Sequence, residues 1–156
     1  DCETAGYNKP LTVVCFYTPK DGQIEVTSLI KGKDLNKENI ERALSGCKLL
    51  ITYNGCISDL KWIERDFPGV ISPTIPHLDL YLVAKELNLN TNLKVLETTF
   101  NIDRIDKKTQ RRFIAVKLWK RYIEKGDENA LATLIEYNKQ DTINLYPIAE
   151  ELMSQV

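Results

Sequence analysis

A run of β-branched and aromatic residues from Leu11 to Thr18 most constrains what this chain can fold into. The run is nearly continuous, which is typical of a buried β-strand. Lys20-Asp21-Gly22 follows as a turn signal, and the residues from Gln23 to Ile30 again have the character of a strand. The two runs therefore predict a β-hairpin early in the chain.

Strand–helix units follow the hairpin, and helical patterns fill the end of the chain. The expected elements are a helix over 37–44, a strand over 48–53, a helix from Ser58 or Asp59 to Phe67, a short strand around His77, a helix over 79–87, a helix that Asn92 caps, and helical structure from Arg112 onward, with a break at Gly126-Asp127 and a start or kink of the last helix at Pro147. This order predicts one α/β domain over residues 1–156, with a mixed β-sheet flanked by α-helices.

The residue types present limit the chemistry to carboxylates. His77 is the only histidine among 156 residues, and the four cysteines lack Cys-x-x-Cys spacing. A zinc site of the usual motif spacing is therefore absent, and a Ser-His-Asp or Cys-His arrangement would depend on His77 alone. The cysteine spacing predicts reduced thiols in a cytoplasmic protein, and no apolar run approaches the ~20 residues of a membrane helix.

Asp1-Cys2-Glu3 is the first candidate site. In a strand, the Asp1 and Glu3 side chains project from the same face, and two like charges held so close are unfavourable unless a cation joins them. Mg²⁺ binds through a few carboxylates together with substrate phosphates. The net charge of −1 gives no global attraction for nucleic acid, so contact with a polyanion must come from metal or from a local patch.

Two further carboxylates stand in comparable contexts. Asp59 follows the turn at Asn54-Gly55, at the start of a predicted helix, where it either stabilises the helix N-terminus or projects from the carboxyl edge of the sheet. Tyr137 and Asp141 are four residues apart on a predicted helix, so they lie on one face. Such a pair is common at surfaces, but a carboxylate on a packed helix needs a partner, and a metal is one candidate.

The three motifs together resemble those of the DEDD exonucleases of the ribonuclease-H-like superfamily, in the tyrosine (DEDDy) form. A closer resemblance is to the YprB-type ribonuclease-H-like domain, whose characteristic stretches occur in order over almost the whole chain. These are Tyr53-Asn54-Gly55, His77-Leu78-Asp79-Leu80, residues 92–97, Val116-Lys117-Leu118-Trp119, residues 125–131 and residues 137–141. In that family an apolar strand leads into the first Asp, so the first strand is expected to be truncated at residue 1.

The resemblance implies a 3′–5′ exonuclease of single-stranded DNA or RNA. Asp1, Glu3, Asp59 and Asp141 would hold two Mg²⁺ or Mn²⁺ ions, and Tyr137 would orient or help to deprotonate the attacking water. Two alternatives stay open at this point. One is a catalytically weak or inactive module that binds nucleic acid, and the other is an endonuclease of the same superfamily.

The residues expected to contact nucleic acid are Asn54 and the basic run Lys107, Lys108, Arg111 and Arg112. That run is the densest part of a segment rich in Lys and Arg that extends from Arg104 to Lys125. Asp79 is predicted to cap the helix that follows it, and Trp62 is predicted to lie in the core.

Overall fold

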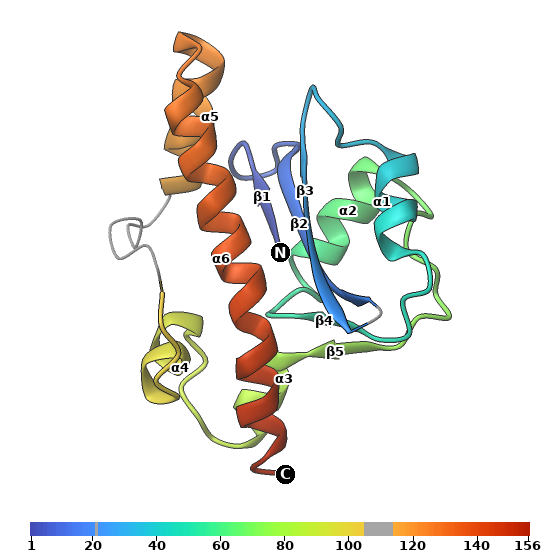
Figure 1. The fold of residues 1–156 in the computed structure, drawn as a ribbon, viewed down its shortest axis with the longest axis vertical. Coiled ribbons are helices and arrows are strands. Elements are labelled where there is room, and N and C mark those ends of the chain that lie inside the picture. The colour runs from blue at the N-terminus through green and yellow to red at the C-terminus, as the bar shows by residue number, and fades with distance from the viewer. Residues whose placement is uncertain (21, 105–113) are drawn as a thin grey trace.

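The structure is a computed structural model that describes residues 1–20, 22–104 and 114–156 (Figure 1). Its elements, in chain order, are β1 (Cys2–Thr4), β2 (Leu11–Lys20), β3 (Gln23–Ile30), α1 (Lys37–Leu44), β4 (Leu50–Thr52), α2 (Asp59–Asp66), β5 (His77–Asp79), α3 (Leu80–Glu86), α4 (Leu93–Thr99), α5 (Ile114–Lys125) and α6 (Glu128–Met153). Each predicted element within the described residues is present, with boundaries that differ by a few residues.

The predicted hairpin forms the main sheet. Strands β1, β2 and β3 pair antiparallel in that order, with Val13 of β2 opposite Glu3 of β1 and Ile30 of β3. The register of β1 shifts between Glu3 and Thr4, which marks a bulge that re-aims the side chains there. Because side chains alternate along a strand, Val13 and Val14 enter hydrophobic clusters on opposite faces of the sheet.

Helices cover both faces of this sheet (Figure 1). On one face, Ile40 of α1 and Ile63 of α2 pack with Val14. On the other face, Leu118 of α5 and Leu134 of α6 pack with Val13. The buried strand predicted from the sequence is therefore the middle layer of three, and burial of its apolar side chains on both faces stabilises the arrangement.

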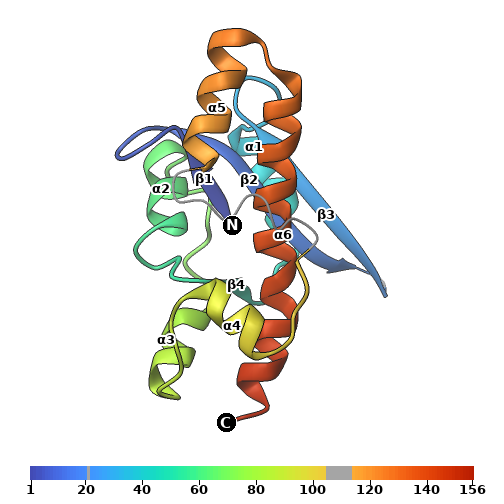
Figure 2. The same ribbon diagram turned by 90° about the vertical axis from the view of Figure 1, so that its left-hand side faces the viewer.

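A second layer of structure lies below the main sheet, around the C-terminal half of α6 (Figure 2). Strands β4 and β5 pair in parallel, and the third hydrophobic cluster joins Leu80 of α3, Leu96 of α4 and Ile148 of α6. Helix α6 therefore runs through two separate clusters, with its middle turns between them.

The predicted fold class is confirmed, because helices flank strands that pair in both directions. One detail differs. Among the described residues the antiparallel and parallel strands form two hydrogen-bonded sheets rather than one mixed sheet. One backbone donor of β1 bonds to a side chain, since the Cys2 N–H donates to the carboxylate of Asp59 at 2.7 Å. This donor is therefore not free to pair with a further strand.

The helix caps predicted at Asp79 and Asn92 are confirmed, and of the two alternatives predicted for Pro147 the start of the last helix is excluded. Asn36, Asp79 and Asn92 each accept a hydrogen bond from a backbone N–H in the first turn of the helix that follows. Pro147 does not start the last helix, because α6 continues through it to Met153. The proline removes one backbone donor, and packing of Ile148 and Leu152 stabilises the helix around it.

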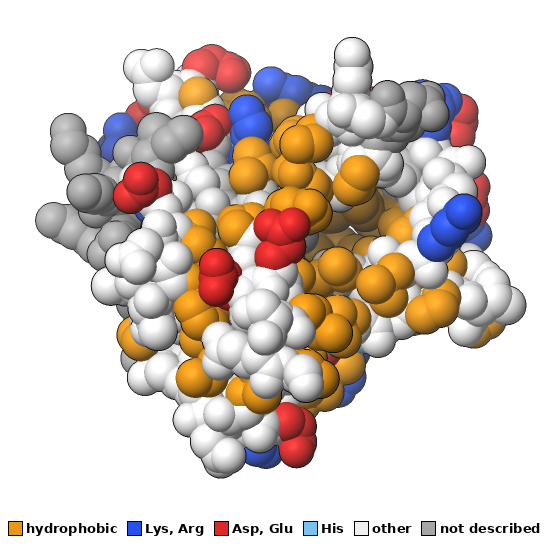
Figure 3. Space-filling view, turned by 60° about the horizontal axis from the view of Figure 1, so that its bottom comes forward, with side chains coloured by type: hydrophobic (Ala, Val, Ile, Leu, Met, Phe, Trp, Pro, Cys, Tyr) orange, Lys and Arg blue, Asp and Glu red, His pale blue; other side chains and the backbone are white. Residues whose placement is uncertain are grey.

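The end of the molecule that carries α3 and the C-terminus of α6 exposes hydrophobic side chains around a hollow (Figure 3). Exposed hydrophobic residues of these two helices include Leu82 and Met153. No helix in the part of the chain that the structure describes is long and apolar enough to cross a membrane.

Candidate active site

Strand β1 presents the Asp1 and Glu3 side chains on one face, as the Asp-x-Glu spacing predicts. Cys2, between them, is buried in the cluster on the opposite face. The backbone around this pair is fixed, because the Asp1 carbonyl accepts from the Cys15 N–H at 2.9 Å and the Glu3 carbonyl accepts from the Thr12 hydroxyl at 3.0 Å. The two carboxylates therefore project from a rigid strand.

Helix α6 brings the third carboxylate to this strand. The side chain of Asn138 donates to Asp1 Oδ2 at 2.5 Å. This hydrogen bond connects the middle of α6 to residue 1. Asp141, one turn further along the helix, lies with Asp1 and Glu3 in a group whose ligand oxygens are all within 4.8 Å of one another. Carboxylates from the two ends of the chain thus form one acidic cluster, which consists of Asp1, Glu3 and Asp141.

Asp59 lies beside this acidic cluster and is not part of the 4.8 Å group. It is buried at the first turn of α2, where its Oδ1 accepts from the Cys2 N–H at 2.7 Å and its Oδ2 accepts from the Ser58 hydroxyl at 2.7 Å. Its charge still acts on the cluster, since it is one of the causes of the raised pKa of Glu3. In this arrangement both oxygens of Asp59 accept hydrogen bonds, and its role as a metal ligand stays a prediction.

Crowded negative charge changes the titration of two residues. Desolvation, followed by the charges of Asp141 and Asp59, raises the pKa of Glu3 from 4.5 to about 8. Desolvation and the charges of Asp141 and Glu3 also raise the pKa of Tyr137 above its ordinary value. At neutral pH the metal-free cluster therefore holds a proton on Glu3, and Tyr137 keeps its phenolic proton.

A buried polar network behind Asp141 was missed by the sequence analysis. Arg104, the first residue of the segment rich in Lys and Arg, is only 8% exposed. Its Nη1 donates to Glu97 Oε1 at 2.7 Å, and its Nη2 lies 2.5 Å from Asp141 Oδ1. The Asn144 side chain also donates to Glu97 Oε1, at 2.8 Å. Glu97 falls within the stretch 92–97, but nothing in its spacing pointed to Arg104.

The donors present fit a hard divalent cation. The acidic cluster supplies only carboxylate oxygens, which Mg²⁺ and Mn²⁺ prefer. Asp141 Oδ1 is buried and pairs with the Arg104 guanidinium, and a carboxylate oxygen has two lone pairs, so one remains for a cation. Bound cations also remove the repulsion that raises the pKa of Glu3. Asp1, Glu3 and Asp141 are the residues that would hold the metal, and the buried Asp59 carboxylate lies beside them.

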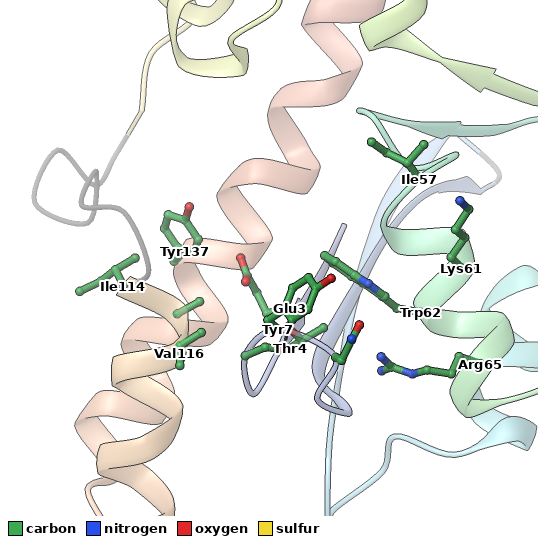
Figure 4. Close-up of a pocket in the computed structure, with 13 residues that line it drawn as sticks. Glu3, Thr4, Tyr7, Ile57, Lys61, Trp62, Arg65, Ile114, Val116 and Tyr137 are labelled. Atoms are coloured by element: carbon green, nitrogen blue, oxygen red, sulfur yellow. Dashed lines mark hydrogen bonds between the residues drawn. The ribbon is translucent and has the colours of Figure 1, made fainter.

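A cavity of about 670 Å³ opens next to the acidic cluster. Figure 4 shows Glu3 between Tyr137 of α6 on one side and Trp62 of α2 on the other. The wall on the α2 side also carries Lys61 and Arg65. The cavity thus combines a carboxylate, aromatic rings and cations, and Trp62, predicted as a core residue, both packs on the core and lines this cavity.

The remaining predicted contacts are placed as follows. Lys107, Lys108, Arg111 and Arg112 lie outside the described residues. Asn54 is in the turn after β4 with a positive φ of 59°, and its N–H donates to Asp79 Oδ1 at 2.6 Å. Asn54 is not among the residues that line the cavity, and its contact with nucleic acid stays a prediction.

A carboxylate cluster at the junction of a strand and a helix in an α/β fold is an arrangement that metal-dependent enzymes acting on phosphoryl groups use. The chain matches the family model described as RNase_H superfamily over residues 1–153, and it belongs to that superfamily. Membership indicates a nuclease-type, metal-dependent phosphodiester hydrolase with nucleic acid as substrate. Neither the curated proteins nor the solved structures contain a match to this chain.

The raised pKa of Glu3 predicts that metal binding stabilises the fold more at high pH. In the metal-free protein the protonated Glu3 contributes stability that is complete below its ordinary pKa of 4.5 and is lost as the pH rises towards about 8. A divalent cation competes with that proton and replaces the lost stability. A Mn²⁺ concentration of about 100 times the Kd measured near pH 9 is expected to raise the Tm by roughly 5 °C at that pH. The same concentration is expected to raise the Tm by less near pH 6. Equal shifts in melting experiments at the two pH values would contradict this.

Proposed function

We propose that this protein is a metal-dependent 3′–5′ exonuclease that hydrolyses phosphodiester bonds of single-stranded nucleic acid. The observation that carries the proposal is the meeting of Asp1 and Glu3 with Asp141 within 4.8 Å, next to Tyr137. The 3′–5′ polarity and the use of two ions rest on the resemblance to the DEDDy exonucleases.

The chain's own residues prepare the reaction in two ways. Bound Mg²⁺ or Mn²⁺ ions activate water and stabilise the leaving oxygen in such a site. Asp1 and Glu3, fixed on β1, and Asp141, fixed on α6, hold the ligand oxygens in place before substrate arrives. The Tyr137 hydroxyl keeps its proton because its pKa is raised, so it orients the attacking water as a hydrogen-bond donor or acceptor.

The cavity supports a single strand as the substrate. Base stacking on aromatic side chains is worth about 1–3 kcal/mol per base and does not depend on sequence. Trp62 and Tyr7 line the cavity and supply such rings, while Lys61 and Arg65 supply positive charge for phosphates. A duplex keeps its bases stacked on each other, so a frayed or single-stranded end suits this cavity better.

Replacement of Lys61 tests the assignment of the cavity. Lys61→Gln removes one cation that would contact phosphate, so the slope of log affinity against log salt is expected to become shallower by about 0.7 for a single strand. Fluorescence anisotropy measures this with the Asp141→Asn protein, which should not degrade the strand. Lys85→Gln on α3 is the matched control, since Lys85 is exposed and does not line the cavity. An equal change of the salt slope in both variants would mean that the strand does not bind in this cavity.

A degradation assay tests the function itself. With Mg²⁺ or Mn²⁺, single-stranded DNA or RNA labelled at its 5′ end should shorten stepwise from the 3′ end and release nucleoside 5′-monophosphates. Cleavage of a circular single strand would instead identify an endonuclease, because a circle has no 3′ end. Intact substrate under all these conditions would contradict both nuclease assignments.

One observation favours a second candidate, a module that binds nucleic acid without cutting it. The Arg104 guanidinium lies 2.5 Å from Asp141 Oδ1 and already supplies a positive charge to a residue of the acidic cluster. Binding of a single strand without hydrolysis, in the presence of Mn²⁺, would select this candidate. Hydrolysis by the unaltered protein would exclude it.

A further inference from the structure

A second group of metal-ligating side chains lies outside the acidic cluster. Cys56 follows the turn after β4, and His77 and Asp79 are the first and last residues of β5. One donor atom from each residue lies within 4.8 Å of the other two. No motif spacing indicates this group, because a helix and a loop separate Cys56 from the His-x-Asp pair.

We propose that Cys56, His77 and Asp79 form a binding site for a Zn²⁺-class ion, separate from the Mg²⁺ or Mn²⁺ site of the acidic cluster. A thiolate, an imidazole and a carboxylate are the donor types that zinc takes, whereas Mg²⁺ avoids sulfur. The proposal does not depend on the proposed nuclease activity. Zinc sites often have three protein ligands and an open fourth position. Because Cys56 is exposed, solvent can occupy that fourth position here.

The spacing of the two stronger donors agrees with tetrahedral zinc. Cys56 Sγ lies 3.6 Å from His77 Nδ1. In a tetrahedral site with a Zn–S bond of ~2.3 Å and a Zn–N bond of ~2.0 Å, the sulfur and nitrogen are about 3.5 Å apart. The pair therefore needs almost no rearrangement to share an ion.

Outer contacts already orient the ligands. His77 Nε2 lies 2.8 Å from the Thr52 hydroxyl, so this hydrogen bond holds the ring and leaves Nδ1 for the metal. Asp79 Oδ1 accepts from the N–H groups of Asn54 and Tyr81, while Oδ2 accepts from the Cys56 N–H at 3.1 Å. A carboxylate oxygen has two lone pairs, so Oδ2 keeps one for an ion.

The backbone that carries Cys56 is closely fitted to this site. A Cβ atom on Gly55 would lie 2.6 Å from Thr52 Cβ, which is an overlap, so only glycine allows the turn to sit against Thr52. That contact brings Cys56 over the imidazole that Thr52 holds. An ion bound here would tie the turn after β4 to β5, and Ser58, which bonds both Asn54 and Asp59, connects the same turn to the first turn of α2.

Titration with Co²⁺ tests the site, because cobalt replaces zinc and reports sulfur ligation. The whole chain, reduced and stripped of metal, is expected to show a thiolate-to-cobalt charge-transfer band that saturates at one equivalent and disappears when Zn²⁺ is added. Cys56→Ser should abolish the band, and His77→Gln should weaken Co²⁺ binding by about 100-fold or more. Cys47→Ser is the matched control, and both it and Asp141→Asn should keep the band.

The proposal is contradicted by a wild-type protein that shows no such band, and equally by a band that persists in Cys56→Ser. A melting experiment provides a second readout, since Zn²⁺ should raise the Tm of the wild type and of Cys47→Ser but raise that of Cys56→Ser much less. Similar Zn²⁺ shifts in all three proteins would place zinc at the acidic cluster alone and contradict the second site. Circular dichroism verifies that each variant is folded.

Discussion

Asp141→Asn is expected to lower the rate of phosphodiester hydrolysis by roughly 10³-fold or more, because a bound metal contributes several kcal/mol to the transition state and each 1.36 kcal/mol is tenfold in rate. The asparagine keeps the shape of the side chain on α6 and removes one of the three charges within 4.8 Å. Since Asp141 is the largest charged cause of the raised pKa of Glu3, the same change should lower that pKa. Single-turnover rates on a linear single strand measure the first effect.

The matched control is Glu136→Gln, one residue from Tyr137 on the same helix. Glu136 is exposed and pairs only with Lys139 at 3.9 Å, so its loss should change the rate less than about twofold. Chemical denaturation of both variants separates chemistry from folding. If Asp141→Asn loses stability in proportion to its rate, Asp141 is a structural residue, and the nuclease site must lie elsewhere.

Glu97→Ala is expected to have the largest effect on stability, lowering the free energy of unfolding by about 3–5 kcal/mol. Glu97 is 2% exposed and accepts from both Arg104 and Asn144 through one oxygen. Its removal leaves a buried guanidinium with only Asp141 as a charged partner. The Tm should fall by roughly 10 °C. Urea denaturation measures the change, with exposed Glu86→Ala as the control.

A double-mutant cycle shows whether this loss comes from the unpaired charge. Arg104→Met should be less destabilising in the Glu97→Ala protein than in the wild type, because the first change has already broken the pair. Additive effects would mean that Glu97 stabilises the fold through its bond with Asn144 and through packing rather than through Arg104. Glu97→Ala should also weaken metal binding, since Arg104 would then neutralise Asp141 without competition from a second carboxylate.

Local patterns allowed much of the fold to be predicted. The hairpin follows from the apolar run and the turn at Asp21-Gly22, and the caps at Asp79 and Asn92 follow from side chains that bond their own neighbours. The acidic cluster could also be predicted in part. The spacing of Asp1 and Glu3 places both side chains on one face of a strand, and the spacing of Tyr137 and Asp141 places both on one face of a helix. These features depend on residues a few positions apart.

Features that depend on distant side chains could not be predicted in this way. Arginine is a residue type that usually lies at the surface. Arg104 contacts Glu97 and Asp141 because α4 packs against α6. Asp59 was expected to join the other acids, but its orientation follows from two hydrogen bonds, to Cys2 and Ser58, that no spacing reveals. The single-domain assignment and the residues of the basic run stay predictions.

Helix α6 has two roles, packing at its two ends and carrying site residues in its middle turns. Its first turns enter one hydrophobic cluster through Leu131 and Leu134, and its last turns enter another through Ile148 and Leu152. The turns between them carry Tyr137 and Asp141. Apolar packing at both ends fixes the position of the polar centre. The buried polar side chains between the two clusters therefore meet Asp1, Glu97 and Arg104 at defined positions, which ties the acidic cluster to the scaffold.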